Sequence, residues 1–218
     1  MRFGLRVSDC EIACGARLGH SRNPKPETRN RIMKSPALAL IATLALSGAA
    51  LAAEVGGVKL DDKASVGGQE LVLNGAGVRT RAIFRVYVGS LYLPAKATTA
   101  DAALAKGPRR IQLNLLRNLS ASQLVDALVD GLKDNTSEAE RASIQRETDE
   151  LVAVMKSIGD AKEGDVVTLD FVDGATRIGH NGQAKGSVAG EAFNRALTRI
   201  WIGERPVQGD LKKSMLGG

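Results

Sequence analysis

The sequence is poor in the residues that carry most covalent and metal chemistry. Its 218 residues include two cysteines and two histidines. Because the cysteines are Cys10 and Cys14, the chain beyond them has no disulfide, thiol nucleophile or cysteine metal ligand. Beyond His20 the only histidine is His180, beside the turn signal Asn181-Gly182. A metal site needs several ligands. We therefore expect no metal or other cofactor, and we interpret His180 as a residue flanking a surface turn.

The chain beyond residue 52 also lacks a large excess of positive charge. The whole chain has 30 basic and 24 acidic residues, a net charge of +6. Residues 1–52 hold eight of the basic and three of the acidic residues, which leaves 22 and 21, a net charge of +1. Nucleic-acid binding usually needs a basic surface, so we expect no nucleic-acid partner.

Long hydrophobic runs are absent as well. The most apolar run, Ala37–Leu46, is too short for a membrane-spanning helix. It follows Met33-Lys34 and precedes Ala50-Leu51-Ala52, which together form the basic start, apolar centre and small-residue cleavage site of a signal peptide. We predict a signal peptide over residues 33–52, cleavage near Ala52/Ala53, a periplasmic or secreted product, and no transmembrane segment in the mature chain.

Residues 1–32 are polar and rich in arginine, and they place the signal peptide too far from the first residue. We interpret them as an upstream extension that belongs to a wrongly assigned start, with translation beginning at Met33. An organelle transit peptide is the alternative that the arginines favour, whereas Cys10, Glu11 and the clear signal peptide argue against it. The mature chain, residues 53–218, has the length of one domain.

The order of the predicted elements indicates the fold class. Alternation in Arg110–Leu115 predicts a strand, Ser120–Gln123 is a capping box that begins a helix, and Asp173-Gly174 and Asn181-Gly182 are hairpin signals. Strands are predicted at 58–60, 70–73, 83–93, 110–115, 166–172, 175–180 and 183–188, and helices after Ser120, from Ser137 to Gly159, at Glu191–Ile202 and at Asp210–Leu216. Runs of strands and helices, rather than alternation, predict an α+β fold with a largely antiparallel sheet and a helical layer on one face.

The run Gly75-Ala76-Gly77 superficially resembles a dinucleotide-binding loop. The third glycine is absent and a strand follows instead of a helix, so nucleotide binding is not expected. We interpret these glycines as turn residues.

Several segments in order carry a family resemblance. They are LNGAGVR, FRVYVGSLYLP, RRIQLNLLRNLSASQL, NGQAKGSVAGEAFNRALTRIWIGERPV and GDLKKSMLG. The series resembles the bacterial chalcone isomerase-like family over nearly all of the mature chain. The resemblance implies an open-faced sandwich, in which a ligand cleft lies between a large antiparallel sheet and a helical layer. The superfamily contains isomerases that cyclise chalcones to flavanones and non-catalytic members that bind fatty acids.

The resemblance carries the isomerases' site onto this sequence residue by residue. Their cleft arginine matches Arg79, and their catalytic threonine falls on Tyr87. Their active-site tyrosine and asparagine fall near Leu124 and Gly131, and a polar pair before Ile-Gly-Glu falls on Ile200-Trp201. The groups that position the reactive phenolate and a water are therefore replaced. Catalysis is not expected, and Leu124, Gly131, Ile200 and Trp201 become candidate cleft walls.

Fatty-acid-binding members keep this arginine and carry a tyrosine at the threonine position, so the resemblance implies that Arg79 and Tyr87 bind a fatty acid or similar amphipathic carboxylate. A guanidinium offers paired donors to a carboxylate, and a phenol adds a third. If the chain reverses near Ala82-Ile83, both side chains lie on one face of the sheet. Arg81 and Arg85 share their parity and are expected to reach solvent at the hairpin tip.

Two other functions stay open. One is an isomerase, an intramolecular lyase acting on a chalcone-like or other enone substrate, with Arg79 as the catalytic anchor. The other is a structural or partner-binding envelope module whose cleft is filled by its own side chains. The sequence leaves the oligomeric state open.

The signal peptide can be tested by N-terminal sequencing of the exported protein. We expect the mature N-terminus at or near Ala53, because Ala50-Leu51-Ala52 is the cleavage pattern. A mature protein that begins within residues 1–32 would contradict both the predicted start and the predicted cleavage.

Overall fold

Short turns join most neighbouring strands, and this dictates antiparallel pairing. In the computed structural model, which describes residues 53–218, seven strands form one sheet in the sequential order β3-β4-β5-β6-β7-β8-β9, and every neighbouring pair is antiparallel. The strands are β3 (Lys63–Val66), β4 (Gln69–Arg81), β5 (Phe84–Leu93), β6 (Arg109–Leu115), β7 (Val166–Val172), β8 (Ala175–His180) and β9 (Gln183–Ala189). The proposed extension (1–32) and signal peptide (33–52) lie outside the described residues.

Both predicted hairpin turns are present. Asp173-Gly174 joins β7 to β8 and Asn181-Gly182 joins β8 to β9, and all four residues have positive φ. That backbone matches the twist of the flanking strands, and Asn, Asp and Gly adopt it most easily. A separate hairpin of β1 (Ala53–Val55) and β2 (Val58–Leu60) precedes the main sheet.

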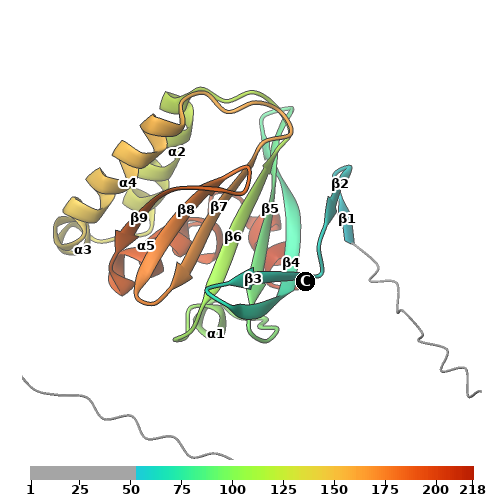
Figure 1. Ribbon diagram of the computed structural model, residues 1–218, viewed down its shortest axis with the longest axis horizontal. Coiled ribbons are helices and arrows are strands. Elements are labelled where there is room, and N and C mark those ends of the chain that lie inside the picture. The colour runs from blue at the N-terminus through green and yellow to red at the C-terminus, as the bar shows by residue number, and fades with distance from the viewer. Residues whose placement is uncertain (1–52) are drawn as a thin grey trace, which may run out of the picture. The chain divides into compact units, whose positions relative to one another are not determined.

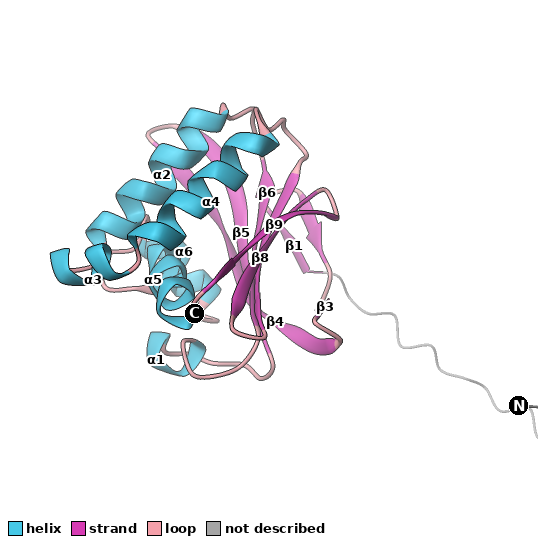
Figure 2. Cartoon of the chain, turned by 60° about the vertical axis from the view of Figure 1, so that its left-hand side comes forward, coloured by secondary structure: helices cyan, strands magenta, loops and turns pink. Residues whose placement is uncertain are grey.

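The helices lie together on one face of the curled sheet, and the β1–β2 hairpin lies on the other (Figures 1 and 2). They are α1 (Ala100–Ala103), α2 (Ala121–Asp134), α3 (Glu138–Ser143), α4 (Gln145–Ile158), α5 (Glu191–Ile202) and α6 (Gly209–Met215). The predicted α+β class with a helical layer on one face is thus confirmed. No helix within residues 53–218 is long and apolar enough to cross a membrane.

The core fills the layer between sheet and helices. Helix α5 contributes a regular apolar stripe that is almost completely buried: Phe193, Ala196, Leu197, Ile200 and Trp201. Burial of side chains of this size supplies most of the free energy that holds a helix to a sheet. The capping box at α2 is also confirmed, because Ser120 Oγ accepts from Gln123 N and Gln123 Oε1 accepts from Ser120 N.

The helix predicted from Ser137 to Gly159 is not continuous. The chain leaves helical geometry at Ile144, which has φ −113° and ψ 14°, and this residue separates α3 from α4. Ile144 is buried in the core. The chain therefore changes direction where this side chain enters the core, and the spacing of apolar residues in the sequence did not predict the change.

The predicted turn at Gly75-Ala76-Gly77 is wrong, because all three residues lie within the long strand β4. The two glycines allow the backbone of α6 to approach this strand closely. A Cβ on Gly75 would overlap the carbonyl oxygen of Ser214, and one on Gly77 would lie 2.9 Å from Ser214 Cβ. The preceding residue, Asn74, is a bulge in the β4–β5 register, and its buried amide donates to the carbonyl of Met215 at 2.7 Å.

Replacing Gly75 by alanine should destabilise the protein by about 1–3 kcal/mol, because the added methyl group must displace α6. Gly209→Ala is the matched control within α6, since a Cβ there meets nothing within 4 Å. We expect that control to be neutral or slightly stabilising, because alanine is the better helix former. Chemical denaturation measures both variants. Equal stability of Gly75→Ala and the wild type would contradict the close approach.

Candidate functional site

Strands β4 and β5 bring the two predicted ligand-binding residues together. The chain reverses at Ala82-Ile83, and Arg79 lies directly opposite Tyr87 in the register. The Tyr87 ring lies on the same face as Gly89, where a Cβ would meet both this ring and Leu211 of α6. Tyr87 thus faces the helical layer.

A β-bulge lies between Arg85 and Tyr87 on strand β5. Arg79 pairs with Tyr87 while Thr80 pairs with Arg85, so Val86 is the extra residue of the register. An extra residue shifts the alternation of side chains by one. Arg85 accordingly donates to the carbonyl of Gly56, in the β1–β2 hairpin on the other face of the sheet. The expectation that Arg85 shares the face of Tyr87 is therefore wrong.

The hydroxyl of Tyr87 is held by helix α5. Trp201 Nε1 donates a hydrogen bond of 3.0 Å to Tyr87 Oη, and the Trp201 side chain is buried. An indole N–H can only donate, so the phenol oxygen accepts in this contact. The phenol keeps its own hydrogen for a second partner, and a carboxylate oxygen is a suitable acceptor.

The guanidinium of Arg79 is positioned by its own strand and by the residue before α6. Arg79 Nη1 donates to the carbonyl of Thr80 and, at 3.4 Å, to Gln208 Oε1. Gln208 Oε1 also accepts from Thr80 N at 2.8 Å, and Gln208 Nε2 donates to Val78 O at 3.4 Å. These contacts occupy one end of the guanidinium and leave Nε and Nη2 as donors for a ligand.

Burial raises the pKa of the Tyr87 hydroxyl above its ordinary value of 10.0, because a phenolate would lose its hydration. The hydrogen bond from Trp201 and the positive charge of Arg79 oppose this rise but do not reverse it. Tyr87 is therefore a neutral hydrogen-bond donor at ordinary pH.

The four candidate cleft walls lie in the packed helical layer. Leu124 and Gly131 lie on α2, and Ile200 and Trp201 lie on α5; all four are buried. A Cβ on Gly131 would lie 2.7 Å from Ile200 Cγ2, so this glycine allows the two helices to pack closely. Among the four, Trp201 is the one with a hydrogen bond to Tyr87. The others are core residues of the α2–α5 contact.

Two surface hollows lie away from Arg79 and Tyr87. One, of about 230 Å³, lies between the loop before β6 and the β7–β8 turn and includes Lys106, Phe171 and Glu191. The other, of about 380 Å³, lies beside α6 and includes Lys212 and Leu216.

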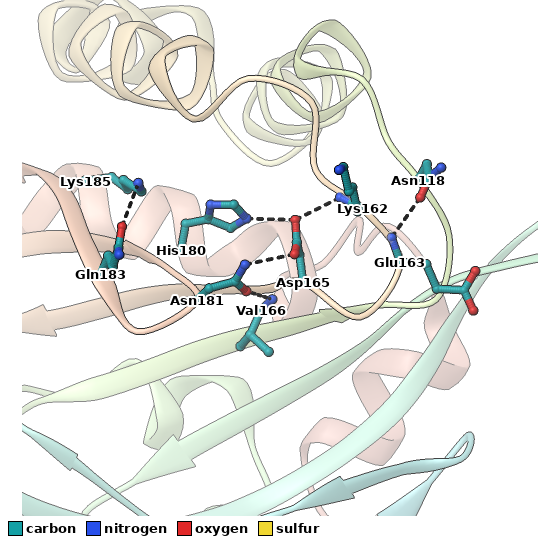
Figure 3. Close-up of polar contacts among 9 residues, drawn as sticks. All are labelled: Asn118, Lys162, Glu163, Asp165, Val166, His180, Asn181, Gln183 and Lys185. Atoms are coloured by element: carbon teal, nitrogen blue, oxygen red, sulfur yellow. Dashed lines mark hydrogen bonds and ion pairs between the residues drawn. The ribbon is translucent and has the colours of Figure 1, made fainter.

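His180 has a different partner (Figure 3). Its Nε2 lies 2.9 Å from Asp165 Oδ2, and Asp165 also accepts from Asn181 Nδ2 and from the backbone N–H of Lys162. These three groups, Asn181 foremost, lower the pKa of the Asp165 carboxyl to about 2. The cluster fastens the β8–β9 turn to the loop before β7. No group of three or more metal-ligating side chains is found in residues 53–218.

Sequence reasoning missed two members of the site. The sequence did not point to Gln208, although a polar residue two positions before the predicted helix at 210–216 was a usable signal. Trp201 was expected to be a core residue or at best a cleft wall, and its N–H contact with Tyr87 is long-range: 114 positions separate the two residues. Neither the Arg79–Gln208 nor the Tyr87–Trp201 hydrogen bond produces a periodic pattern of residues in the sequence.

Comparison with known proteins gives matches of two kinds. A family model described as chalcone isomerase-like matches residues 52–217. Among solved structures, the crystal structure of the Arabidopsis thaliana fatty-acid binding protein AtFAP1 is similar, with a TM-score of 0.57 and 15% sequence identity. The match covers 73% of this chain and 92% of the other. No curated protein matches the sequence.

The environment of Tyr87 can be tested by titrating phenolate absorbance in a Tyr92→Phe variant, which leaves Tyr87 as the only tyrosine. We expect its pKa above 10, and a further rise in Trp201→Phe, which removes the donor to the phenolate. Because the folded pKa exceeds the unfolded one, the contribution of Tyr87 to stability is present below pH 10 and lost as pH rises above it. A pKa at or below 10 in the folded protein would refute this arrangement.

Proposed function

The chain belongs to the chalcone isomerase-like family, and we propose that it is a non-catalytic member that binds a fatty acid or similar amphipathic carboxylate. The observation that carries the proposal is the opposed pair of Arg79 and Tyr87, with the phenol oxygen already occupied by Trp201 as an acceptor. This leaves the phenol hydrogen and the remaining guanidinium N–H groups to meet one anion.

The chemistry of the pair favours a carboxylate. A guanidinium with Nε and Nη2 available matches the two oxygens of a carboxylate, and the phenol of Tyr87 adds a neutral donor. Hydrogen bonds to a charged partner are about twice as strong as those between neutral groups. The raised pKa of Tyr87 keeps this donor protonated beside the anion.

The apolar layer beside Tyr87 suits an acyl chain. Leu211 of α6 and Trp201 are buried there, so apolar side chains adjoin the Tyr87 donor. Burial of each methylene of the ligand contributes about 0.8 kcal/mol. Because these side chains already fill the space, the ligand requires that side chains of α6 move aside, and the proposal includes this adjustment. The similarity to a fatty-acid binding protein supports the same ligand class.

The absence of catalysis belongs to the same proposal. The positions that resemble the isomerases' polar residues carry Leu124, Gly131 and Ile200, which are buried in the contact between α2 and α5. None of these side chains can donate or accept a proton. Export is also part of the proposal, which rests on the signal-peptide pattern of residues 33–52. It places the bound amphiphile in the periplasm or outside the cell.

A second candidate function is a structural or partner-binding envelope module. It is favoured by the burial of Leu124, Ile200 and Trp201 and by the two hollows that lie away from Arg79. In this function Arg79, Gln208 and Tyr87 serve to anchor α6 and α5 to the sheet, and no small ligand is needed.

Native mass spectrometry of gently purified protein, together with titration of the delipidated protein with palmitate, distinguishes the two functions. We expect a bound acid, and about a tenfold to hundredfold weaker affinity in Arg79→Ala, because a charge-assisted hydrogen bond is worth about 1.5–3 kcal/mol. Tyr87→Phe should weaken binding less. Arg146→Ala, which removes an exposed arginine of α4 far from both strands in sequence, is the matched control.

Unchanged palmitate affinity in Arg79→Ala would remove the carboxylate site. Absence of any acid and of any palmitate binding by the wild type would instead favour the structural module. Turnover of a chalcone that is lost in Arg79→Ala would show that the chain is an isomerase.

A further inference from the structure

The described part of the chain exposes few large apolar side chains, and two of them are neighbours. Ile83 is 86% exposed and Phe84 is 54% exposed, at the turn between β4 and β5. The third, Val129, is 39% exposed and stands alone on α2. Scattered apolar residues are normal on a surface, whereas adjacent ones at a projecting turn need a reason.

Arginines surround this pair. Arg81 and Arg85 flank it in sequence and both are exposed. Arg117, also exposed, comes from the end of β6 and lies with its Cζ 4.9 Å from the centre of the Phe84 ring. We call residues 81–85 with Arg117 the hairpin tip.

Strands β4 and β5 supply no carboxylate to the arginines of the hairpin tip, and Arg85 donates to the carbonyl of Gly56 in the β1–β2 hairpin. The sequence from Leu71 to Ala100 contains no aspartate or glutamate. Among residues 53–218, Arg81, Arg85 and Arg117 are in none of the ion pairs. The loop before β7, which pairs with the segment after Arg117, contains Asp160, Glu163 and Asp165 as well as Lys162, and Asp165 is bound by His180 and Asn181. Asp160 accepts from the N–H of Ala121.

We propose that the hairpin tip docks the protein on an anionic lipid surface, with Ile83 and Phe84 entering the boundary between headgroups and acyl chains. Phenylalanine and aliphatic side chains of peripheral membrane segments bury themselves at this boundary. The three arginines lie around them at the level of the lipid phosphates, which guanidinium groups bind in bidentate geometry. Basic side chains near such a surface each strengthen binding several-fold.

The composition of the hairpin tip favours lipid over a protein partner. A stable protein interface buries about 800 Å² on each side, and two apolar side chains at a turn fall far short of that. A flat anionic surface needs only shallow insertion and positive charge, and the hairpin tip supplies both. No residue of the hairpin tip belongs to the proposed carboxylate site, so the docking proposal does not depend on fatty-acid binding. Arg79 lies two residues before the hairpin tip, so docking would bring that site close to the lipid.

Tryptophan reporters test the contact locally. In the full chain, Phe84→Trp places a reporter at the hairpin tip, and Val129→Trp is the matched control at the remaining exposed apolar position. The wild type supplies the baseline, because its only tryptophan is the buried Trp201. Each protein is mixed with vesicles of phosphatidylcholine alone, or with an equal share of phosphatidylglycerol, with and without brominated acyl chains that quench tryptophan.

With anionic vesicles we expect blue-shifted emission and bromine quenching in the Phe84→Trp protein and neither response in the Val129→Trp protein. Combining Arg81→Gln, Arg85→Gln and Arg117→Gln in the Phe84→Trp chain should weaken the response about a hundredfold, with unchanged far-ultraviolet circular dichroism. The apolar run in residues 33–52 could itself bind vesicles, and such binding would not depend on these arginines. The proposal is overturned by an unresponsive reporter at the hairpin tip, by equal responses of both reporters, or by an unchanged response after the three substitutions.

Discussion

The close contact between α6 and strand β4 is the constraint on which the site depends. Gly75 and Gly77 have no side chains, so the helix backbone can rest directly on the strand. Asn74 binds the carbonyl of Met215 at one end of the helix, and Gln208 binds Val78 and Thr80 at the other. Strand β3 pairs only with the first four residues of β4, so the rest of this edge has no neighbouring strand in the sheet. Gln208, directly before α6, supplies hydrogen-bond partners to the backbone of that edge. The position of Arg79 follows from that contact.

The three polar residues of the site divide the hydrogen bonding among them. Trp201 can only donate, so it fixes the oxygen of Tyr87 and leaves the hydroxyl hydrogen free. Gln208 holds one end of the Arg79 guanidinium. Because these holding groups come from α5 and from the residue before α6, the helical layer preorganises donors that are themselves carried by the sheet. Preorganised donors bind an anion with a smaller loss of side-chain entropy.

A single extra residue gives the β4–β5 hairpin two different surfaces. The bulge at Val86 leaves Tyr87 on the helical side and turns Arg85 toward the β1–β2 hairpin. The arginines that look equivalent in sequence therefore have separate environments: Arg79 is partly buried beside Gln208, whereas Arg81, Arg85 and Arg117 are exposed around Ile83 and Phe84. The carboxylate site and the hairpin tip are adjacent without sharing residues.

Local sequence patterns were enough to predict the α+β class, the hairpin turns after β7 and β8, the capped start of α2 and the buried stripe of α5, because each depends on neighbouring residues or a regular period. The sequence also suggested that Arg79 and Tyr87 share one face, but a two-residue turn at Ala82-Ile83 alone would pair Arg79 with Val86, so their direct pairing depends on the bulge. Four features became visible in the three-dimensional structure: Gly75 and Gly77 lie under a helix, Ile144 interrupts a helix, Val86 redirects Arg85, and Gln208 and Trp201 hold the site. These features depend on contacts between segments far apart in the chain, or on one unpaired residue in a register, and neither produces a local pattern.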